Sequence, residues 1–476
     1  MSDNHINRRN FLKVMGVGAG AAAAATVPGC SPKKSDSGLE DESFSTAPVP
    51  KGKMTYRYDK KTKAKVSLLG FGCMRFPSTT NEKGEDVIDQ EAVNHLVDYA
   101  IDHGITYFDT APAYGQSEDV VGISLSRYPR DKYLVATKLS NFDPSTWSLE
   151  AAKEMYHTSL KRIKVDYVDY YLLHVVGMGG VKGAKSRFID NGMLDFLMQE
   201  REAGRIRNLG FSYHGDVEAY DYLLSQHDKY KWDFVQIQLN YVDWENHGGD
   251  KGLDASYLYG ELEKRGIQAV IMEPLLGGRL ARLTPTALQM LKKIHPDLSP
   301  ASWAFRFAGS KPIVLTVLSG MTYMEHLQDN IRTFSPLTPL TNEEQQTLKT
   351  IADLMLHSDL IPCTQCKYCM PCPYGLNIPE VFAHYNRCVN DKMLLKSSSD
   401  PNYVKARREF LYGYDRSVPK LRQANHCIGC KQCEPKCPQG IKISDQMERI
   451  DKLTENLKQN LAFDNTHEEQ LKQGQE

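Results

Sequence analysis

Residues 105–139 read ITYFDTAPAYGQSEDVVGISLSRYPRDKYLVATKL, and the pattern in this stretch decides the fold. Two short apolar runs, 105–111 and 133–139, flank a segment whose apolar residues recur at helical spacing. Short and nearly continuous apolar runs are typical of strands buried on both faces, and parallel strands need a crossover such as a helix. The stretch therefore predicts a strand–helix–strand unit of a parallel sheet.

The same unit recurs through the middle of the chain. Strands are expected at eight apolar runs, each followed by a helical pattern: 66–73, 105–111, 133–139, 168–174, 206–212, 234–240, 268–274 and 313–320. Eight units over roughly 250 residues are what a (β/α)8 barrel requires, whereas a doubly wound sheet needs fewer. We predict an α/β fold, with a (β/α)8 TIM barrel over residues 51–340 and a hairpin, TYRYDKKTKAKVS, that closes its bottom.

Composition limits the classes of function. The chain has 476 residues, 41% of them hydrophobic, and a formal net charge of −1. This length allows one large and one small domain. Because the charge is close to zero, there is no electrostatic reason to expect nucleic acid as a partner.

Two cysteine runs near the C-terminus hold eight of the eleven cysteines. Each run has three cysteines at three-residue steps and then a Cys-Pro, and the expected metal ligands are Cys363, Cys366, Cys369, Cys372, Cys427, Cys430, Cys433 and Cys437. Three cysteines at this spacing wrap around one cubane cluster, whereas a zinc ion usually takes its ligands as two separated pairs. The runs predict two [4Fe-4S] clusters, and paired zinc sites are the alternative.

Both runs resemble the bacterial ferredoxin motif, although the first has two residues rather than three before its Cys-Pro. In two-cluster ferredoxins the fourth cysteine of each run ligates the other cluster. The resemblance therefore implies that Cys437 completes the first triplet and Cys372 the second. The sequences after the runs, CPYGLNIPEVFAHYN and CPQGIKISDQMERID, repeat one another, and an internal duplication explains this.

The two triplets start 427 − 363 = 64 residues apart, and the insert between them has helical patterns. We therefore expect a mostly α-helical ferredoxin-type domain at 341–462. Thr341 and Glu344 form a capping-box pattern at its start. A polar, disordered tail is expected at 463–476.

Four polar residues lie at or just after the ends of three consecutive predicted strands: Asp109, Tyr114, Lys138 and His174. In such barrels the chemistry is at the carboxyl ends of the strands. The stretches LGFGCMR (69–75), YFDTAPAYGQSE (107–118), ATK (136–138) and YYLLH (170–174) resemble the aldo/keto reductase family at the matching strands. This resemblance implies an enzyme that transfers a hydride between a nicotinamide cofactor and a small carbonyl or alcohol substrate.

The resemblance also implies a role for each of the four residues. Tyr114 would protonate the developing alkoxide, and His174 would orient and polarise the carbonyl oxygen. A tyrosine with a pKa of about 10 is a reluctant acid. Lys138, held by Asp109, is therefore expected to lower the Tyr114 pKa.

The same resemblance places the nicotinamide cofactor against nine residues: Gly72, Met74, Ser212, Gln236, Pro274, Leu275, Gly278, Gly320 and Asn330. Three neighbouring positions depart from the family. Tyr213 stands in place of an asparagine, Met272 in place of an aromatic ring, and Tyr323 in place of a base that grips the 2′-phosphate of NADP. Because that charge-assisted contact is lost, NADP preference is doubtful and NAD is an equal candidate.

The N-terminus, NRRNFLK (7–13) followed by an apolar Gly/Ala-rich stretch to Gly29, resembles a twin-arginine signal peptide. The apolar stretch is too short for a membrane span. We expect a signal peptide at 1–30, a flexible linker at 31–50, and a periplasmic or cell-envelope location. Cys30 follows Val27-Pro28-Gly29, in which Pro is atypical of a lipoprotein box, so Cys30 is a candidate for lipidation, and the chain would reach the membrane only if Cys30 were lipidated.

These features predict an exported oxidoreductase of the aldo/keto reductase type, with two [4Fe-4S] clusters for electron transfer and a redox partner protein. An alternative is an electron-transfer or docking protein whose barrel catalyses no reaction and whose clusters have a structural role. Cys73 and Cys388 are expected to be buried apolar residues. Three histidines, His103, His214 and His326, are expected in loops or at the surface.

Overall fold

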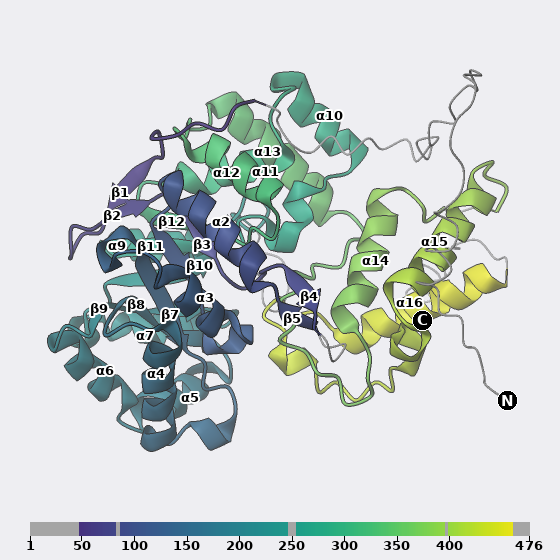
Figure 1. The fold of residues 1–476 in the computed structure, drawn as a ribbon. Helices are drawn as coiled ribbons and strands as arrows, with labels where there is room; N and C mark the ends of the chain where they lie inside the picture. Colours follow the sequence, from purple (N-terminus) through teal and green to yellow (C-terminus); the bar gives the residue numbers. More distant parts are fainter. Residues whose placement is uncertain (1–46, 82–85, 246–253, 396–397, 460–476) are drawn as a thin grey trace, which may run out of the picture. The chain divides into compact units, whose positions relative to one another are not determined.

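The computed structural model describes residues 47–81, 86–245, 254–395 and 398–459. Its larger part is built around a closed barrel of parallel strands, in the order β10-β11-β12-β3-β6-β7-β8-β9 (Figure 1). The barrel strands are β3 (Leu69–Gly72), β6 (Tyr107–Asp109), β7 (Leu134–Leu139), β8 (Val168–Val176), β9 (Ile206–Tyr213), β10 (Phe234–Gln238), β11 (Gln268–Met272) and β12 (Val314–Ser319). Each overlaps a predicted run, so the predicted (β/α)8 barrel is confirmed.

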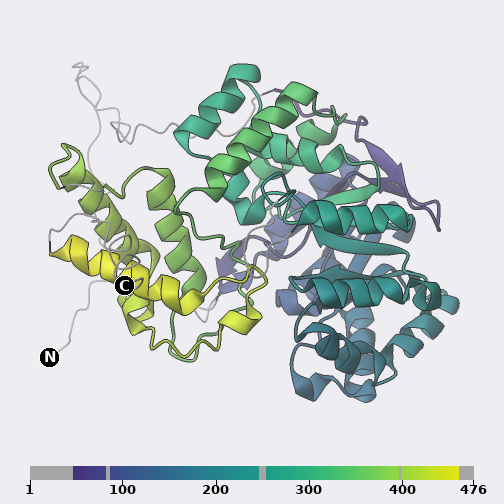
Figure 2. The ribbon, with the colours of Figure 1, turned by 180° about the vertical axis from the view of Figure 1, so that it is seen from behind.

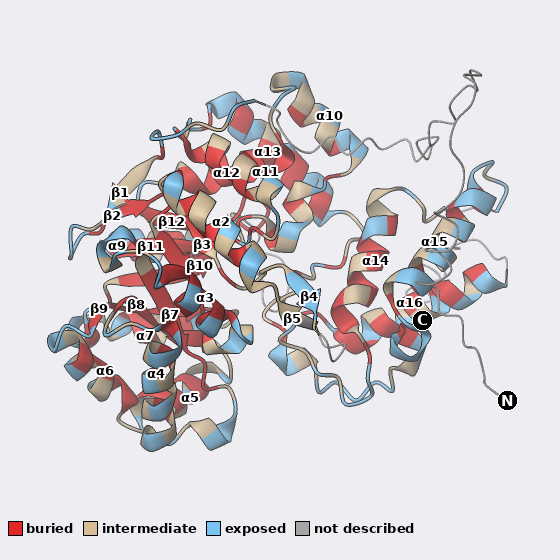
Figure 3. Cartoon of the chain, in the orientation of Figure 1, coloured by how far each residue is buried: buried red, intermediate tan, exposed pale blue. Residues whose placement is uncertain are grey.

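Helices surround the strands on the outside of the barrel (Figures 1 and 2). They are α2 (Gln90–Asp102), α3 (Ser117–Leu125), α4 (Leu149–Ile163), α5 (Gly180–Ala184), α6 (Met193–Glu202), α7 (Val217–Ser225), α8 (His227–Tyr230), α9 (Ala255–Lys264), α10 (Pro285–Ile294), α11 (Pro300–Gly309) and α12 (Met324–Phe334), with one π-helical turn at Lys185–Ile189. Side-chain caps such as Ser148, which accepts from Ala151 N, begin several of them. Because helices cover one face and the barrel interior the other, the strands are almost entirely buried, and β8 is buried over its whole length (Figure 3).

The bottom of the barrel is closed by the hairpin of β1 (Tyr56–Tyr58) and β2 (Lys65–Ser67), which pair antiparallel. The Tyr170 hydroxyl, from inside the barrel, donates to Asp59 Oδ2 in this hairpin at 2.9 Å. Val66 packs in the same interior cluster as Tyr107 and Phe234. The predicted run 66–73 is thus divided between the hairpin and β3. A second hairpin, β4 (Ser78–Thr80) with β5 (Asp86–Ile88), follows β3.

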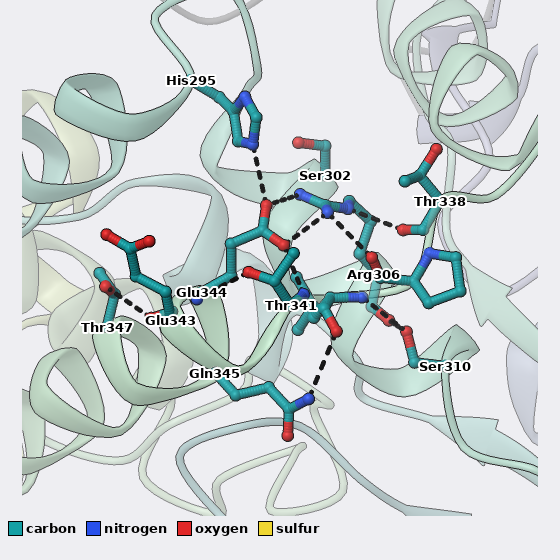
Figure 4. A network of polar contacts seen from close by, with 12 residues as sticks. His295, Ser302, Arg306, Ser310, Thr338, Thr341, Glu343, Glu344, Gln345 and Thr347 are labelled. Atoms are coloured by element: carbon teal, nitrogen blue, oxygen red, sulfur yellow. Dashed lines mark hydrogen bonds and ion pairs between the residues drawn. The ribbon is translucent and has the colours of Figure 1, made fainter.

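Helix α13 (Asn342–Leu356) begins with the expected capping box, in which Thr341 and Glu344 bond one another reciprocally. Glu344 also accepts two hydrogen bonds from Arg306 of α11, at 2.7 and 2.9 Å (Figure 4). Leu348, Ile351 and Met355 pack in the apolar core of the barrel. Helix α13 therefore belongs to the barrel domain. The C-terminal domain begins after α13, and not at residue 341 as expected.

The C-terminal domain has its own apolar core, built by α14 (Ile378–Asn390), α15 (Tyr403–Ser417) and α16 (Ile443–Lys458). Short 3-10 turns η6 (Lys420–Arg422), η7 (Ala424–His426) and η8 (Glu434–Lys436) lie between α15 and α16. Helices α14 and α16 each begin five residues after a Cys-Pro, which agrees with an internal duplication. In the described ranges no helix is long and apolar enough to cross a membrane. The expected signal peptide and Cys30 lie outside those ranges, as does the C-terminal tail.

Candidate active site

An ion pair between two adjacent strands lies at the carboxyl end of the barrel. Lys138 of β7 donates from Nζ to Asp109 Oδ1 of β6 at 2.6 Å and to the Thr110 carbonyl at 2.9 Å. Lys138 is fully buried and Asp109 is 3% exposed. Burial raises the pKa of Asp109, and the Lys138 ammonium opposes this rise. The pair is a fixed charge arrangement at the mouth of the barrel.

Tyr114 ends the 3-10 turn η1 (Pro112–Tyr114) that follows β6. The Lys138 ammonium lies 5.0 Å from the centroid of the Tyr114 ring. Burial raises the pKa of Tyr114 well above its usual value, with smaller contributions from Tyr368 and Asp109. The expectation that Lys138 lowers this pKa is therefore wrong. Asp109 neutralises the ammonium, so desolvation of the tyrosinate dominates.

His174, near the end of β8, is fixed on both sides of its ring. Its Nδ1 lies 2.7 Å from Ser140 Oγ, and its Nε2 lies 3.3 Å from the Tyr368 hydroxyl. Burial lowers the pKa of His174 well below its usual value, and the charge of Lys138 adds to this. The imidazole is therefore neutral near pH 7. When Ser140 donates to Nδ1, the proton of His174 is on Nε2.

Tyr368 belongs to the first cysteine run, between Cys366 and Cys369, and it lies among aromatic residues of the barrel. Its ring centroid is 5.9 Å from that of Phe142 and 6.0 Å from that of His214. Two further contacts join this run to the barrel. Arg75 donates to the Thr364 carbonyl at 2.7 Å, and an added Cβ at Gly277 would lie 2.4 Å from Thr364. The first cysteine run thus packs on the carboxyl end of the barrel.

The second cysteine run reaches the same end of the barrel. Gln439, two residues after Cys437, donates to Gln238 Oε1 of β10 at 3.0 Å. An added Cβ at Gly215 would lie 2.9 Å from the Pro438 carbonyl oxygen. Both cysteine runs therefore lie close to the loops that carry the candidate active site.

Sequence reasoning missed three residues of this site: Tyr368, His214 and Glu273. His214, expected in a loop or at the surface, has its Nδ1 buried with no hydrogen-bond partner in the described chain, and burial lowers its pKa to about 4. Burial also raises the pKa of Glu273, which follows β11, while Arg75 opposes this rise. His214 and Glu273 follow barrel strands, and that position was the available signal. For Tyr368 the sequence carries no such signal, because its contacts join two domains.

The structure brings the eight cluster cysteines together as two crossed sets. Cys372, Cys427, Cys430 and Cys433 line one cavity. In the other set, burial raises the pKa of Cys363 to about 12 and that of Cys366 to about 11, and Cys437 adds to both shifts. Burial also raises the pKa of Cys369 to about 12. Every donor of both sets is a cysteine, which is the ligand of iron–sulfur clusters, so the donor sets fit such clusters.

The sequence model of the aldo/keto reductase family matches residues 68–353, more than half of the chain. This chain belongs to the aldo/keto reductase family. A model of the 4Fe-4S dicluster domain matches residues 362–442. The protein thus combines the barrel of an oxidoreductase family with a C-terminal 4Fe-4S dicluster domain.

Individual proteins are similar to this chain over part of its length. L-galactose dehydrogenase of Arabidopsis thaliana is 26% identical over 315 residues, which cover 62% of this chain and 92% of that protein. Protein tas of Escherichia coli (strain K12) is 27% identical over 329 residues, which cover 58% of this chain and 92% of that protein. Among solved structures, an aldo-keto reductase from Bacillus halodurans has a TM-score of 0.49 and 24% identity, over 63% of this chain and 96% of that chain.

The positions expected to bind the aldo/keto reductase cofactor fall into two groups. At the nicotinamide end, Gln236 Oε1 is buried without a partner in the described chain, and Gln236 Nε2 lies 3.6 Å from Met272 Sδ. Ser212 Oγ accepts from Val175 N at 3.1 Å. Asn330 Nδ2 donates to Ser319 Oγ at 2.9 Å. The unpartnered oxygen of Gln236 fits the amide of a nicotinamide.

The remaining cofactor positions lie in the loops at this end of the barrel. Gly72 approaches the Ser319 backbone, Met74 and Leu275 are half-buried, Pro274 is buried, Gly278 is exposed, and Gly320 packs beside the Arg75 side chain. Thr364 of the cysteine run fills the space beside Gly277, the neighbour of Gly278. The positions around Gln236 therefore fit the nicotinamide of a cofactor. The loop positions around Gly278 are already in contact with the C-terminal domain.

Proposed function

We propose that this aldo/keto reductase interconverts a carbonyl group and an alcohol at the mouth of its barrel, and exchanges electrons through two [4Fe-4S] clusters in its C-terminal domain. One observation carries the proposal. The Tyr368 hydroxyl contacts Nε2 of His174, and Tyr368 lies between two cluster cysteines, Cys366 and Cys369. The tetrad of Asp109, Tyr114, Lys138 and His174 and the ligands of one cluster therefore share one wall of the site.

The roles of the tetrad follow from the geometry. Tyr114 keeps its proton because its pKa is raised, so it is the acid that protonates the alkoxide oxygen. The neutral imidazole of His174 donates from Nε2 to the same oxygen and fixes its position. The ion pair with Asp109 keeps the Lys138 ammonium 5.0 Å from the centroid of the Tyr114 ring. Reduction of a carbonyl consumes two electrons and two protons, and Tyr114 supplies the proton that reaches oxygen.

The hydride source that we propose is a nicotinamide nucleotide, NAD or NADP. Family membership and the unpartnered Gln236 Oε1 support a nicotinamide. Tyr323, at the position expected to meet a 2′-phosphate, is 60% exposed and carries no charge, which gives no preference for NADP. A nicotinamide supplies a hydride, whereas each cubane cluster accepts or donates one electron at a time.

The test is anaerobic purification of the full chain, extraction of bound nucleotide, and turnover assays with aldoses, ketoses and their alcohols. Tyr114→Phe should lower kcat by about 10²- to 10⁴-fold while the cluster signals in electron paramagnetic resonance persist. Tyr58→Phe is the matched control, because Tyr58 lies in the bottom hairpin and is 62% exposed. Turnover that survives in Tyr114→Phe shows that another group is the acid.

A second candidate is an electron-transfer or docking protein whose barrel does not turn over. Two contacts favour it. The Tyr368 hydroxyl already contacts Nε2 of His174, and Thr364 already fills the space beside Gly277. Nucleotide binding separates the two candidates. A purified chain that neither contains nor binds NAD(H) or NADP(H) supports the docking protein.

Export through the twin-arginine route is part of the proposal, and NRRNFLK at 7–13 supports it. Clusters are assembled in the cytoplasm, and this route transports folded proteins. The test is a double variant, Arg8→Lys with Arg9→Lys, which should retain the protein in the cytoplasm of a bacterial host. Cys30→Ala should release the exported protein from the membrane fraction if Cys30 carries a lipid.

A further inference from the structure

The cavity of Cys372, Cys427, Cys430 and Cys433 lies directly under an exposed apolar surface. Tyr374, Ile428 and Lys431 line the same cavity as these cysteines. Ile428 is 62% exposed and Tyr374 is 46% exposed, and Cys430 is itself an exposed residue. Nearby, Leu421 is 79% exposed. Exposed large apolar side chains that gather beside candidate metal ligands, as Tyr374, Leu421 and Ile428 do, indicate an interaction surface.

The turn η6 lies beside both cysteine runs. Asn377 N, just after the first run, donates to the Arg422 carbonyl at 3.0 Å. The His426 ring nitrogen Nε2 lies 3.2 Å from the Lys420 carbonyl oxygen, immediately before the second run. These contacts hold Leu421 and its two basic neighbours next to the segment that contains Tyr374 and the segment that contains Ile428.

Positive charges surround this apolar surface. The exposed cations of segment 419–442 are Lys420, Arg422, Lys431, Lys436 and Lys442. The one carboxylate of the segment, Glu434, accepts from the backbone N and the hydroxyl of Ser444. Lys420 does lie 3.7 Å from Asp415, but both side chains are largely exposed, so solvent screens the pair. The segment is basic within a chain whose net charge is −1.

We propose that this face, formed by Tyr374, Leu421 and Ile428 with the cations Lys420, Arg422 and Lys431, is the docking surface of an acidic one-electron-transfer protein. The inference rests on the clusters of the proposed function. The apolar centre would exclude water over the exposed cluster ligand, and the basic rim would attract an acidic partner and orient it. The transfer moves one electron from the reduced cluster to the oxidised partner, or the reverse, and no bond or proton changes.

The test uses the full-length protein, reduced with dithionite and then freed of it, and two oxidised haem proteins in stopped-flow mixing. Ferricytochrome b5 is acidic and ferricytochrome c is basic. A triple variant, Lys420→Glu, Arg422→Glu and Lys431→Glu, should lower the second-order rate constant with cytochrome b5 at least about tenfold and raise that with cytochrome c. Raised salt should slow the wild-type reaction with cytochrome b5.

The matched control variant carries the same charge change away from both cysteine runs, at three exposed lysines of the barrel domain: Lys63→Glu, Lys132→Glu and Lys161→Glu. Equal rate changes in the two triple variants would mean that net charge alone acts, and would overturn the proposal. A wild-type preference for cytochrome c would do the same. So would a dimer in sedimentation that separates in the first triple variant, because a second copy then covers the face.

The test also separates this inference from the proposed function. Iron content and electron paramagnetic resonance establish the clusters before mixing. Tyr114→Phe should lower kcat as given above without any change in the rate of cytochrome b5 reduction. A loss of turnover therefore leaves the docking measurement intact, and a failed docking measurement leaves the carbonyl chemistry intact.

Discussion

The Tyr368 hydroxyl lies 3.3 Å from Nε2 of His174, although the two residues are 194 positions apart in the chain. In the resemblance to aldo/keto reductases, His174 is the residue that meets the substrate oxygen. A residue between two cluster cysteines therefore occupies the contact that the substrate needs. Substrate binding at this barrel must exchange one hydrogen bond for another.

Tyr368→Phe should strengthen substrate binding. The change removes a hydrogen bond of about 1 kcal/mol that the substrate must otherwise displace, so we expect KM to fall about fivefold. Iron content and cluster spectra should not change. Tyr374→Phe is the control, because Tyr374 also follows a cluster cysteine but is 46% exposed. A raised KM in Tyr368→Phe would instead mean that the hydroxyl binds the substrate.

Lys138→Met should destabilise the fold strongly. Removal of one partner of a buried ion pair leaves Asp109 unpaired, at a cost of about 3–5 kcal/mol. The double variant Lys138→Met with Asp109→Leu should recover most of that loss, because no charge then remains buried. Urea denaturation of the anaerobic proteins measures both. An additive double variant would mean that the pair is not coupled.

The pH profile of carbonyl reduction tests the state of Tyr114. An acid with a lowered pKa would lose its proton, and the enzyme its activity, as the pH rises through that value. Because burial raises the pKa of Tyr114, we expect kcat to stay constant between about pH 7 and pH 9. In Asp109→Asn the ammonium of Lys138 is no longer neutralised, so a fall should appear at high pH. A fall below pH 9 in the wild-type protein would contradict this.

His214 should make stability depend on pH. Its folded pKa is about 4, below the usual value of about 6.5 for the unfolded chain. Between these values the unfolded state binds a proton that the folded state does not, so stability falls as the pH drops. The contribution lost between pH 7 and pH 5 is about 2 kcal/mol. In urea denaturation, the His214→Gln variant should lose about 2 kcal/mol less stability than the wild-type protein between pH 7 and pH 5.

Separate removal of the two crossover cysteines should affect different functions. Cys372→Ala should remove the cluster under the exposed face and slow electron exchange with cytochrome b5, while the contacts at His174 remain. Cys437→Ala should remove the cluster beside the barrel and alter turnover. Iron content should fall from roughly eight to about four atoms in each variant. Identical effects of the two changes would contradict the crossed pairing.

The barrel was predictable because its signals are local. Each strand has its own apolar run, and Asp109, Lys138 and His174 each lie at or near the carboxyl end of one, so their meeting at one mouth follows from strand order. The cysteine spacing is equally local. The pKa of Tyr114 was not predictable, because desolvation depends on every atom around the ring rather than on the nearest charge.

The sequence by itself determined the eight strands and predicted the tetrad and the cluster ligands, since periodicity and ligand spacing are properties of neighbouring residues. Only the tertiary structure decided that α13 packs with the barrel core, that His214 and Glu273 lie near the tetrad, and that Tyr368 reaches His174. These are contacts between segments far apart in the chain. Such contacts depend on how two cores pack against one another, and no pattern of adjacent residues encodes that.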